Sequence, residues 1–212
     1  MKKLLHIIAS PRKDASHSEK IADAFKSEYI RLNPSAEIDV LDLWENPIPT
    51  YDAYKVAARM TFAGEGKLEG DLVKAWAEVT EVTGRFKSAD DYLFSVPMWN
   101  SGIPWILKQY IDTVTEPGLT FGFSKDTGFV PLLKDKKAFI VYTTGIYNPS
   151  LPAAFGLDFQ SAYMTWWLNS IGVNQIFPVH YFSNIIAADK EEQKIIAMGA
   201  AVQIASDHFS GQ

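Results

Sequence analysis

The chain has 212 residues, 47% of them hydrophobic and 13% aromatic, which predicts one globular domain over residues 1–212 with a well-buried core. Its formal net charge of −5 at pH 7 leaves no basic surplus to neutralise a nucleic-acid backbone, so we expect no nucleic-acid partner. The sequence contains no cysteine, which excludes disulfides, thiolate metal sites and cysteine nucleophiles in this chain.

The opening stretch MKKLLHIIASPRK has two lysines and a short apolar run, as a signal peptide has. The run is short and meets Ser-Pro-Arg instead of a small-residue cleavage site, so it predicts a strand over residues 4–9. No stretch of the sequence reaches the apolar length that a membrane helix needs. We therefore expect a cytoplasmic protein that does not bind a membrane.

Strand and helix patterns then alternate along the chain. Besides the first, strands are predicted at residues 36–43, 91–96, 137–144 and 174–182. Helices are predicted at residues 18–32, 68–86, 103–114 and 159–171, and from about residue 188 onward. The stretch WENPIPTYDAY between the second strand and the second helix contains two prolines and indicates a loop.

This alternation predicts an α/β fold, because parallel neighbouring strands need a crossover connection. We expect a flavodoxin-like, doubly wound, five-stranded parallel sheet in the order 2-1-3-4-5, with helices on both faces. In such sheets ligands bind at the carboxyl ends of the strands, where the winding direction reverses. The loops that follow the first, third and fourth strands are therefore the candidate site.

The first of these loops, SPRKDASHS, combines hydroxyl groups with one cation. Ser10, Ser16 and Ser18 offer donors to a phosphate, Arg12 offers a forked pair of N–H groups, and the following helix begins there. On this loop alone the simpler interpretation, that Ser16 or Ser18 caps the helix, is slightly favoured. The sequence lacks G-x-G-x-x-G and Walker patterns, which disfavours Rossmann dinucleotide binding and P-loop nucleotide hydrolysis.

The second loop, PMWNSG, follows the third strand. A flat heteroaromatic ring needs an apolar floor with polar contacts at its edge, and Met98, Trp99 and Asn100 offer that combination. The alternative is that Trp99 and Trp105 are core aromatics and Asn100 is a turn residue. The histidines of the chain are scattered without the spacing of metal ligands, so we expect no metal site.

Four stretches, ASPR, SHS, PMWNSGIPWILKQYID and GLTFGFS, occur in that order. Together they resemble the FMN-dependent NADH:quinone oxidoreductases and azoreductases, a family of flavodoxin-like homodimers, over nearly the whole chain. The resemblance implies FMN as cofactor, NADH or NADPH as donor, and quinones, azo compounds or nitro aromatics as acceptors. It implies a ping-pong mechanism, in which hydride passes from the nicotinamide to the flavin N5 and then to the acceptor, with no catalytic side chain.

The resemblance also implies the site residues. The phosphate would contact Ser10, Ser16, His17 and Ser18, and we add Arg12 to this set because of its charge. The flavin ring would contact Pro97, Met98, Trp99, Asn100 and Ser101, and its pyrimidine edge Thr143, Thr144, Gly145 and Ile146. Phe121 and Phe123 would approach the flavin face or the substrate, the alternative being a hairpin-like turn packed on the core.

The chain departs from the family pattern at three places. The loop at 143–146 lacks the usual arginine and carries Ile146 for a glycine, Trp99 replaces a tyrosine, and Ser101 replaces an aromatic residue. A large indole beside a small serine predicts a preference for planar, substituted acceptors.

The helix predicted at residues 159–171 is apolar almost all round, which predicts a homodimer interface. Two other functions stay open. One is a flavodoxin-like electron carrier, for which a strongly acidic docking face is expected although the charges here are mixed. The other is a flavin-free α/β regulatory domain.

Overall fold

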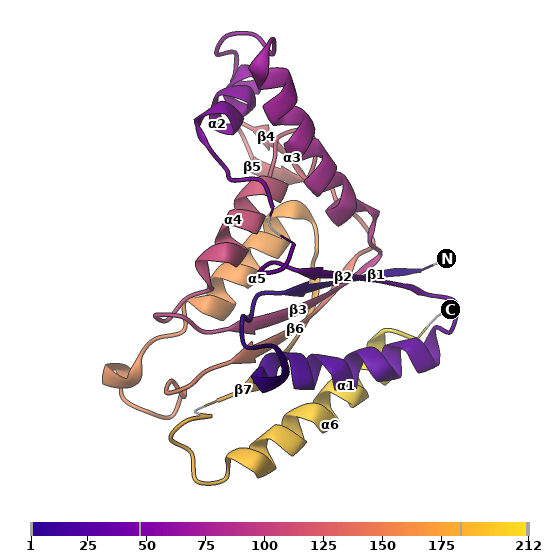
Figure 1. The fold of residues 1–212 in the computed structure, drawn as a ribbon, viewed down its shortest axis with the longest axis vertical. Helices are drawn as coiled ribbons and strands as arrows, with labels where there is room; N and C mark the ends of the chain where they lie inside the picture. Colours follow the sequence, from indigo (N-terminus) through magenta and orange to yellow (C-terminus); the bar gives the residue numbers. More distant parts are fainter. Residues whose placement is uncertain (1, 47, 183, 211–212) are drawn as a thin grey trace.

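Five parallel strands form the central sheet of the computed structural model, which describes residues 2–46, 48–182 and 184–210 (Figure 1). The strands are β1 (Lys3–Ile8), β2 (Glu37–Asp42), β3 (Asp91–Pro97), β6 (Lys137–Thr143) and β7 (Gln175–Tyr181), and they lie in the order β2-β1-β3-β6-β7. The predicted order is confirmed. Because all are parallel, their carboxyl ends meet at one edge, where Pro97 of β3 pairs with Thr143 of β6 and Thr143 pairs with Tyr181.

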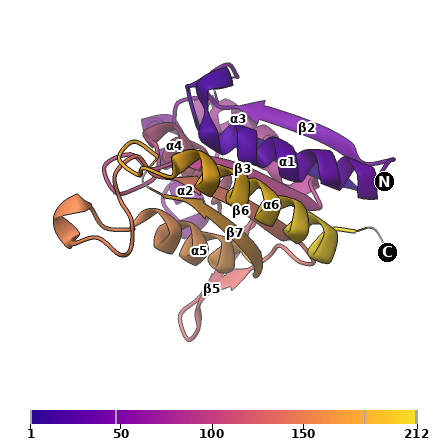
Figure 2. The same ribbon diagram turned by 90° about the horizontal axis from the view of Figure 1, so that it is seen from below.

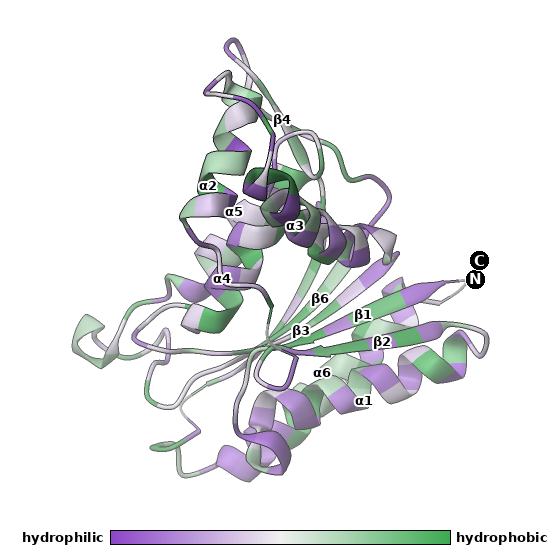
Figure 3. Ribbon diagram, turned by 45° about the horizontal axis from the view of Figure 1, so that its top comes forward, coloured by the Kyte–Doolittle hydropathy of each residue, from purple (hydrophilic) through white to green (hydrophobic). Residues whose placement is uncertain are grey.

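Helices cover both faces of the sheet, as predicted. On one face α1 (His17–Leu32) and α6 (Lys190–His208) lie side by side, and on the other lie α3 (Asp71–Ser88), α4 (Trp105–Val114) and α5 (Gln160–Ile171) (Figures 1 and 2). Alternate residues of a strand face opposite sides, so Leu4 packs with α1 and α6 whereas Leu5 and Ile7 pack with the other helices. In Figure 3, hydrophobic and hydrophilic residues alternate along α1 and α3, as expected for helices with one side on a core.

One helix lies in a stretch that the sequence patterns predicted as a loop, and a hairpin lies where the sequence offered one only as an alternative. The helix α2 (Ala53–Met60) begins inside the stretch predicted as a loop, and the Asp52 carboxylate caps it by accepting hydrogen bonds from the backbone N–H groups of Tyr54 and Lys55. The strands β4 (Phe121–Ser124) and β5 (Gly128–Pro131) form a separate antiparallel hairpin. The hairpin-like alternative for GLTFGF is therefore confirmed. The helix α2 and the hairpin both lie at the end of the molecule where Figure 1 shows α3, and we call this end the α2–α3 side.

The apolar helix α5 is buried only on one side. Met164, Trp167 and Leu168 are buried against the core, but Trp166 keeps 55% of its surface exposed. None of the helices in the described residues is long and apolar enough to cross a bilayer.

Candidate functional site

The loops that follow β1, β3, β6 and β7 surround two adjoining cavities at the carboxyl edge of the sheet. One, of about 220 Å³, is lined by Ser10, Arg12, Ser16, His17, Pro97, Met98, Trp99, Thr143, Gly145, Asn184 and Ile185. The other, of about 350 Å³, is lined by Met98, Asn100, Ser101, Gly145, Ile146, Tyr147, Phe155 and Ile185. The fold therefore brings together most of the residues predicted from the three loops. Ser18 and Thr144 line neither cavity.

The loop between β1 and α1 places buried hydroxyl groups at the start of α1. Ser16 caps this helix, and its Oγ accepts a hydrogen bond from the backbone N–H of Glu19 at 3.3 Å. The capping interpretation is thus confirmed for Ser16. The Oγ of Ser18 lies behind it, 3.1 Å from the Oγ of Ser16, and the Oγ of Ser10 accepts from the N–H of Arg12. Ser16 lines the cavity as well as capping the helix, so the two roles do not exclude each other.

The side chains of Arg12 and His17 lie at the same end of α1. Burial lowers the pKa of the His17 imidazole, and nearby Lys194 and Arg12 lower it further. The buried Nδ1 of His17 has no hydrogen-bond partner among the described residues. Arg12 is exposed, and within the same residues its guanidinium forms no ion pair. Together with the unpaired N–H groups of a helix N-terminus, these donors suit an anion.

The loop after β3 makes a tight reversal. Trp99 and Gly102 exchange two backbone hydrogen bonds of 2.9 Å, and between them Asn100 and Ser101 have φ of 48° and 66°. Two successive left-handed residues characterise a type I′ turn, in which asparagine is favoured. The interpretation of Asn100 as a turn residue is confirmed, yet the same residue lines the larger of the two cavities. Ser101 Oγ accepts a hydrogen bond from the N–H of Leu157 at 3.2 Å, which ties this turn to the segment before α5.

Trp99 belongs to a group of three indoles and not to the core. Its side chain is partly exposed, its ring centre lies 5.8 Å from that of Trp44, and Trp44 lies 5.7 Å from Trp105. Trp105 is 57% exposed, so the core alternative is wrong for it as well. Trp44 Nε1 donates to the carbonyl of Ala9 at 3.1 Å. Sequence analysis missed Trp44, although it follows the second strand and so reaches the same edge.

The loop after β6 is fastened by backbone bonds to its neighbours. The N–H of Met98 donates to the carbonyl of Thr143 at 2.7 Å, and the N–H of Ile185 donates to the carbonyl of Gly145 at 3.0 Å. A Cβ on Gly145 would lie 2.7 Å from the Cδ1 of Ile185, so a larger residue at this position would displace the end of the Ile185 side chain. Asn184 and Ile185 were missed as lining residues, because no chemical pattern marks the stretch after the last strand.

Phe121 and Phe123 do not lie at these cavities in the same chain. Both belong to the hairpin β4–β5, which Figure 1 shows beside α2 and α3 and away from the carboxyl edge of the sheet. Phe121 is buried, with its ring centre 5.0 Å from that of Phe129. Phe123 is 69% exposed. Within one chain, the predicted approach of these two residues to the site is not observed.

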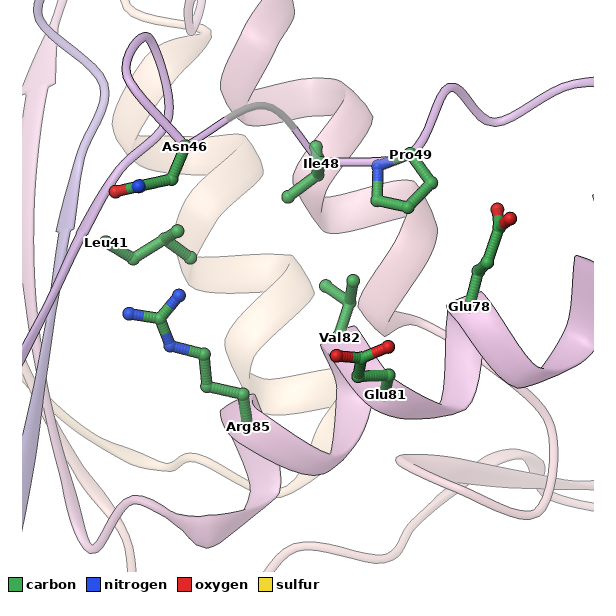
Figure 4. Close-up of a pocket in the computed structure, with 8 residues that line it drawn as sticks. All are labelled: Leu41, Asn46, Ile48, Pro49, Glu78, Glu81, Val82 and Arg85. Atoms are coloured by element: carbon green, nitrogen blue, oxygen red, sulfur yellow. The ribbon is translucent and has the colours of Figure 1, made fainter.

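A larger cavity of about 450 Å³ lies between the loop after β2 and α3 (Figure 4), and it shares no residue with the other two. Leu41, Ile48 and Val82 form its apolar part. Its Arg85 makes two hydrogen bonds to the carboxylate of Asp39, and its Glu78 pairs with Lys55 at 2.9 Å. Because these charges are already satisfied within the chain, we do not assign the site to this cavity.

Comparisons with known proteins agree with this fold. A family model described as a flavodoxin-like fold matches residues 2–203. An FMN-dependent NADH:quinone oxidoreductase from Ruegeria pomeroyi is 41% identical over 204 residues, 95% of this chain and 100% of that protein. One from Desulfotalea psychrophila is 35% identical over 211 residues, 99% of each chain. The crystal structure of an azoreductase from Bacillus anthracis strain Sterne superposes with a TM-score of 0.86 at 25% identity, covering 97% of this chain and 99% of that one.

Proposed function

The chain belongs to the flavodoxin-like family of FMN-dependent NADH:quinone oxidoreductases, and on that premise we propose that it binds FMN and reduces quinones and azo compounds with NADH. Membership of this family was predicted from the sequence and is confirmed. The observation that carries the proposal is the pair of adjoining cavities at the carboxyl edge of the sheet. Residues that family resemblance assigns to FMN line both.

The smaller cavity fits the phosphate end of FMN. Ser10 and Ser16 present hydroxyl groups, and Arg12 supplies a charge that forms a fork with phosphate oxygens. The buried Nδ1 of His17, without a partner in the described chain, gives a further polar contact. An anion at this place also interacts favourably with the N-terminal end of the α1 dipole. Ser18 supports the site indirectly, through its hydrogen bond with Ser16.

The shared wall of the two cavities fits the flavin ring. Met98 and Trp99 give apolar and aromatic surface, and Asn100 gives polar atoms at the edge. The loop from Thr143 to Ile146 closes the opposite side. When bound, FMN supplies hydride-transfer chemistry, and the side chains position it and exclude water. No side chain needs to act as nucleophile or general acid.

We assign donor and acceptor to the same cleft in turn, which is a ping-pong sequence. The sheet-edge cavity of about 350 Å³, bordered by Asn100, Ser101 and Phe155, is the place we propose for the nicotinamide and then for the acceptor ring. Nitro aromatics would stack there in the same way. A single domain over residues 1–212 in the cytoplasm remains part of this proposal.

We also propose a homodimer. Trp166 of α5 packs edge-on against Phe129 of the hairpin, with ring centres 6.2 Å apart, and both are about half exposed. Such a joined apolar surface is suited to a partner copy. In the dimer Phe123, which is exposed and far from its own cleft, would enter the cleft of the partner subunit. Phe121 would support it from the hairpin base.

Absorbance and turnover test the function. The purified chain should show flavin absorbance, oxidise NADH when a quinone is added, and bind FMN again after its removal. A coloured protein without quinone-dependent NADH oxidation would instead favour the electron carrier. A colourless protein that does not bind added FMN would favour the regulatory domain.

A further inference from the structure

Glu116, in the segment after α4, carries a completely buried carboxyl group that the function above does not use. Its Oε1 accepts a hydrogen bond from the Tyr51 hydroxyl at 2.7 Å, and its Oε2 lies 3.4 Å from the Nε of Arg59. Arg59 in turn donates from Nη1 to the Tyr51 hydroxyl at 3.4 Å. Tyr51 precedes α2, and Arg59 belongs to it. This Tyr51–Arg59–Glu116 cluster therefore fastens α2 to the segment that leads into the hairpin.

The cluster also reaches the hairpin itself. The Cζ of Arg59 lies 5.9 Å from the centre of the Phe121 ring, a cation–π distance. The carbonyl of Glu116 accepts hydrogen bonds of 3.1 Å from the N–H groups of Leu119 and Thr120, and the carbonyl of Phe121 accepts from Gly118. Residues 116–121 are thus tied into one turn. Glu116 is thus connected to Phe121 by two routes, its side chain through Arg59 and its backbone through this turn.

A carboxylate at this position costs free energy, because burial disfavours the charged form. Burial raises the pKa of Glu116 to about 7, although Tyr51 and Arg59 favour the charged form. Asp112 of α4 acts in the same direction as burial. A glutamine would keep the hydrogen bond with Tyr51 without that cost. The feature that only the carboxylate provides is its attraction to Arg59.

We propose that Glu116 is a positioning residue, which through Arg59 and Phe121 holds the hairpin β4–β5 in the orientation that lets Phe123 meet the acceptor. The role of the hairpin rests on the function proposed above. The hold on the hairpin does not depend on that function. When Glu116 takes up a proton but stays buried, the cost of burying its charge is removed and the folded chain as a whole gains stability, yet Arg59 loses its ionic partner and the hairpin loosens locally.

Hydrogen exchange tests the hold directly, without any flavin or substrate. Protection factors for residues 121–131 of the full chain should fall about fivefold in Glu116→Gln, the lower end of typical couplings between sites. In the unmodified protein they should fall similarly between pH 8 and pH 6, as the carboxyl group takes up a proton. Glu78→Gln is the matched control, since it removes the ion pair between Glu78 of α3 and Lys55 of α2 and leaves Arg59 and Glu116 in place. Its hairpin protection should not change.

Quinone kinetics test the consequence. Glu116→Gln should raise the KM for quinone about fivefold at pH 8 and leave kcat within about twofold, because binding and not chemistry is affected. In the unmodified enzyme that KM should rise as the pH falls through about 7, and in the variant it should be flat. Glu78→Gln should keep the unmodified pH profile.

The outcomes separate the two proposals. Unchanged hairpin protection in Glu116→Gln overturns the positioning role. Lost protection with an unchanged quinone KM overturns the link to the acceptor, and no quinone turnover in the unmodified protein overturns the proposed function alone. If Glu116→Gln does not fold, the pH series on the unmodified protein decides, and protection that is constant from pH 8 to pH 6 overturns the positioning role.

Discussion

Cavities and charged side chains occur both at the carboxyl edge of the sheet and on the α2–α3 side. The two places differ in how these charged side chains are paired. On the α2–α3 side the cavity is larger, yet Arg85 is bound to Asp39 and Glu116 to Tyr51. At the sheet edge Arg12 has no ionic partner in the described residues. The comparison teaches that cavity volume alone does not indicate where a ligand binds, and that a cation left unpaired beside a cavity is the better guide to an anionic ligand.

The largest effect we expect is on the α2–α3 side, at Glu116. Its pKa in the folded chain is raised by burial to about 7, from 4.5. The folded state therefore retains a proton that the unfolded state releases, and stability falls as the pH rises from 4.5 to about 7. Between about pH 4 and pH 8, the free energy of unfolding of the unmodified protein should fall by about 3 kcal/mol more than that of Glu116→Gln.

Urea unfolding of both proteins at the two pH values measures this difference. Other titrating groups are common to the two proteins and cancel in the subtraction. Identical pH dependence in the two proteins would show that the charge on Glu116 costs nothing in the folded state.

The second prediction compares two arginines. Arg12→Ala should weaken FMN binding by about 1.5–3 kcal/mol, the usual contribution of a hydrogen bond to a charged group. Because Arg12 is exposed, its loss should change the free energy of unfolding by less than about 0.5 kcal/mol. Arg85→Ala, which removes the pair with Asp39, should do the reverse and lower stability without changing FMN affinity.

Flavin titration gives the FMN affinity of each variant, and urea unfolding gives its free energy of unfolding. If Arg85→Ala weakened FMN binding as much as Arg12→Ala does, the assignment of the site to the sheet edge would be wrong.

The third prediction concerns the closure of the sheet-edge cavity. Gly145→Ala places a methyl group against Ile185 and should weaken FMN binding by about 1 kcal/mol, the lower end of overpacking costs. Ile185→Ala in the same chain should restore the affinity, because Ile185 is largely exposed and its truncation frees the space. Gly199→Ala in α6 meets open space and should leave FMN affinity unchanged. If the effects of the two substitutions on FMN affinity simply add in the double variant, Ile185 does not mediate the loss of affinity in Gly145→Ala.

The sequence predicts the central sheet well and the α2–α3 side poorly. The five strands of the sheet were predictable because β1, β3 and β6 are buried apolar runs between helical patterns. The helix α2 was missed, and the hairpin was weighed only as an alternative, because each is short and its stability depends on contacts between distant residues, such as Glu116 with Arg59. Local periodicity does not contain such contacts.

The site divides similarly. The loops after β1, β3 and β6 carry hydroxyl, cationic and aromatic residues that indicate a ligand, and the structure brings these loops together. Trp44, Asn184 and Ile185 join them only because their strands end at the same edge. In the homodimer proposed above, Phe123 would reach a cleft only through a second copy of the chain, and the pattern of one chain indicates this only through family resemblance.

The smallest effect we expect is on acceptor preference. Trp99 lines the smaller cavity and is supported by Trp44, whose Nε1 is bound to Ala9, so the Trp99 indole has a defined place beside the proposed flavin. Offset stacking on an indole adds about 0.5–1.5 kcal/mol beyond buried area, and a larger planar ring gains more of it. Naphthoquinones should therefore have a higher kcat/KM than simple benzoquinones.

Trp99→Ala should reduce the ratio of kcat/KM for naphthoquinones to kcat/KM for benzoquinones by about threefold to tenfold. This follows because kcat/KM reports the loss of transition-state stabilisation for each acceptor. Trp105→Ala is the matched control, because Trp105 is exposed, contacts the same Trp44 and lines neither sheet-edge cavity. Both variants should be measured fully loaded with FMN, so that cofactor loss does not enter the comparison. If the ratio stays at the unmodified value in Trp99→Ala, the indole only closes the cavity wall, and acceptor preference must arise from the side bordered by Ser101 and Phe155.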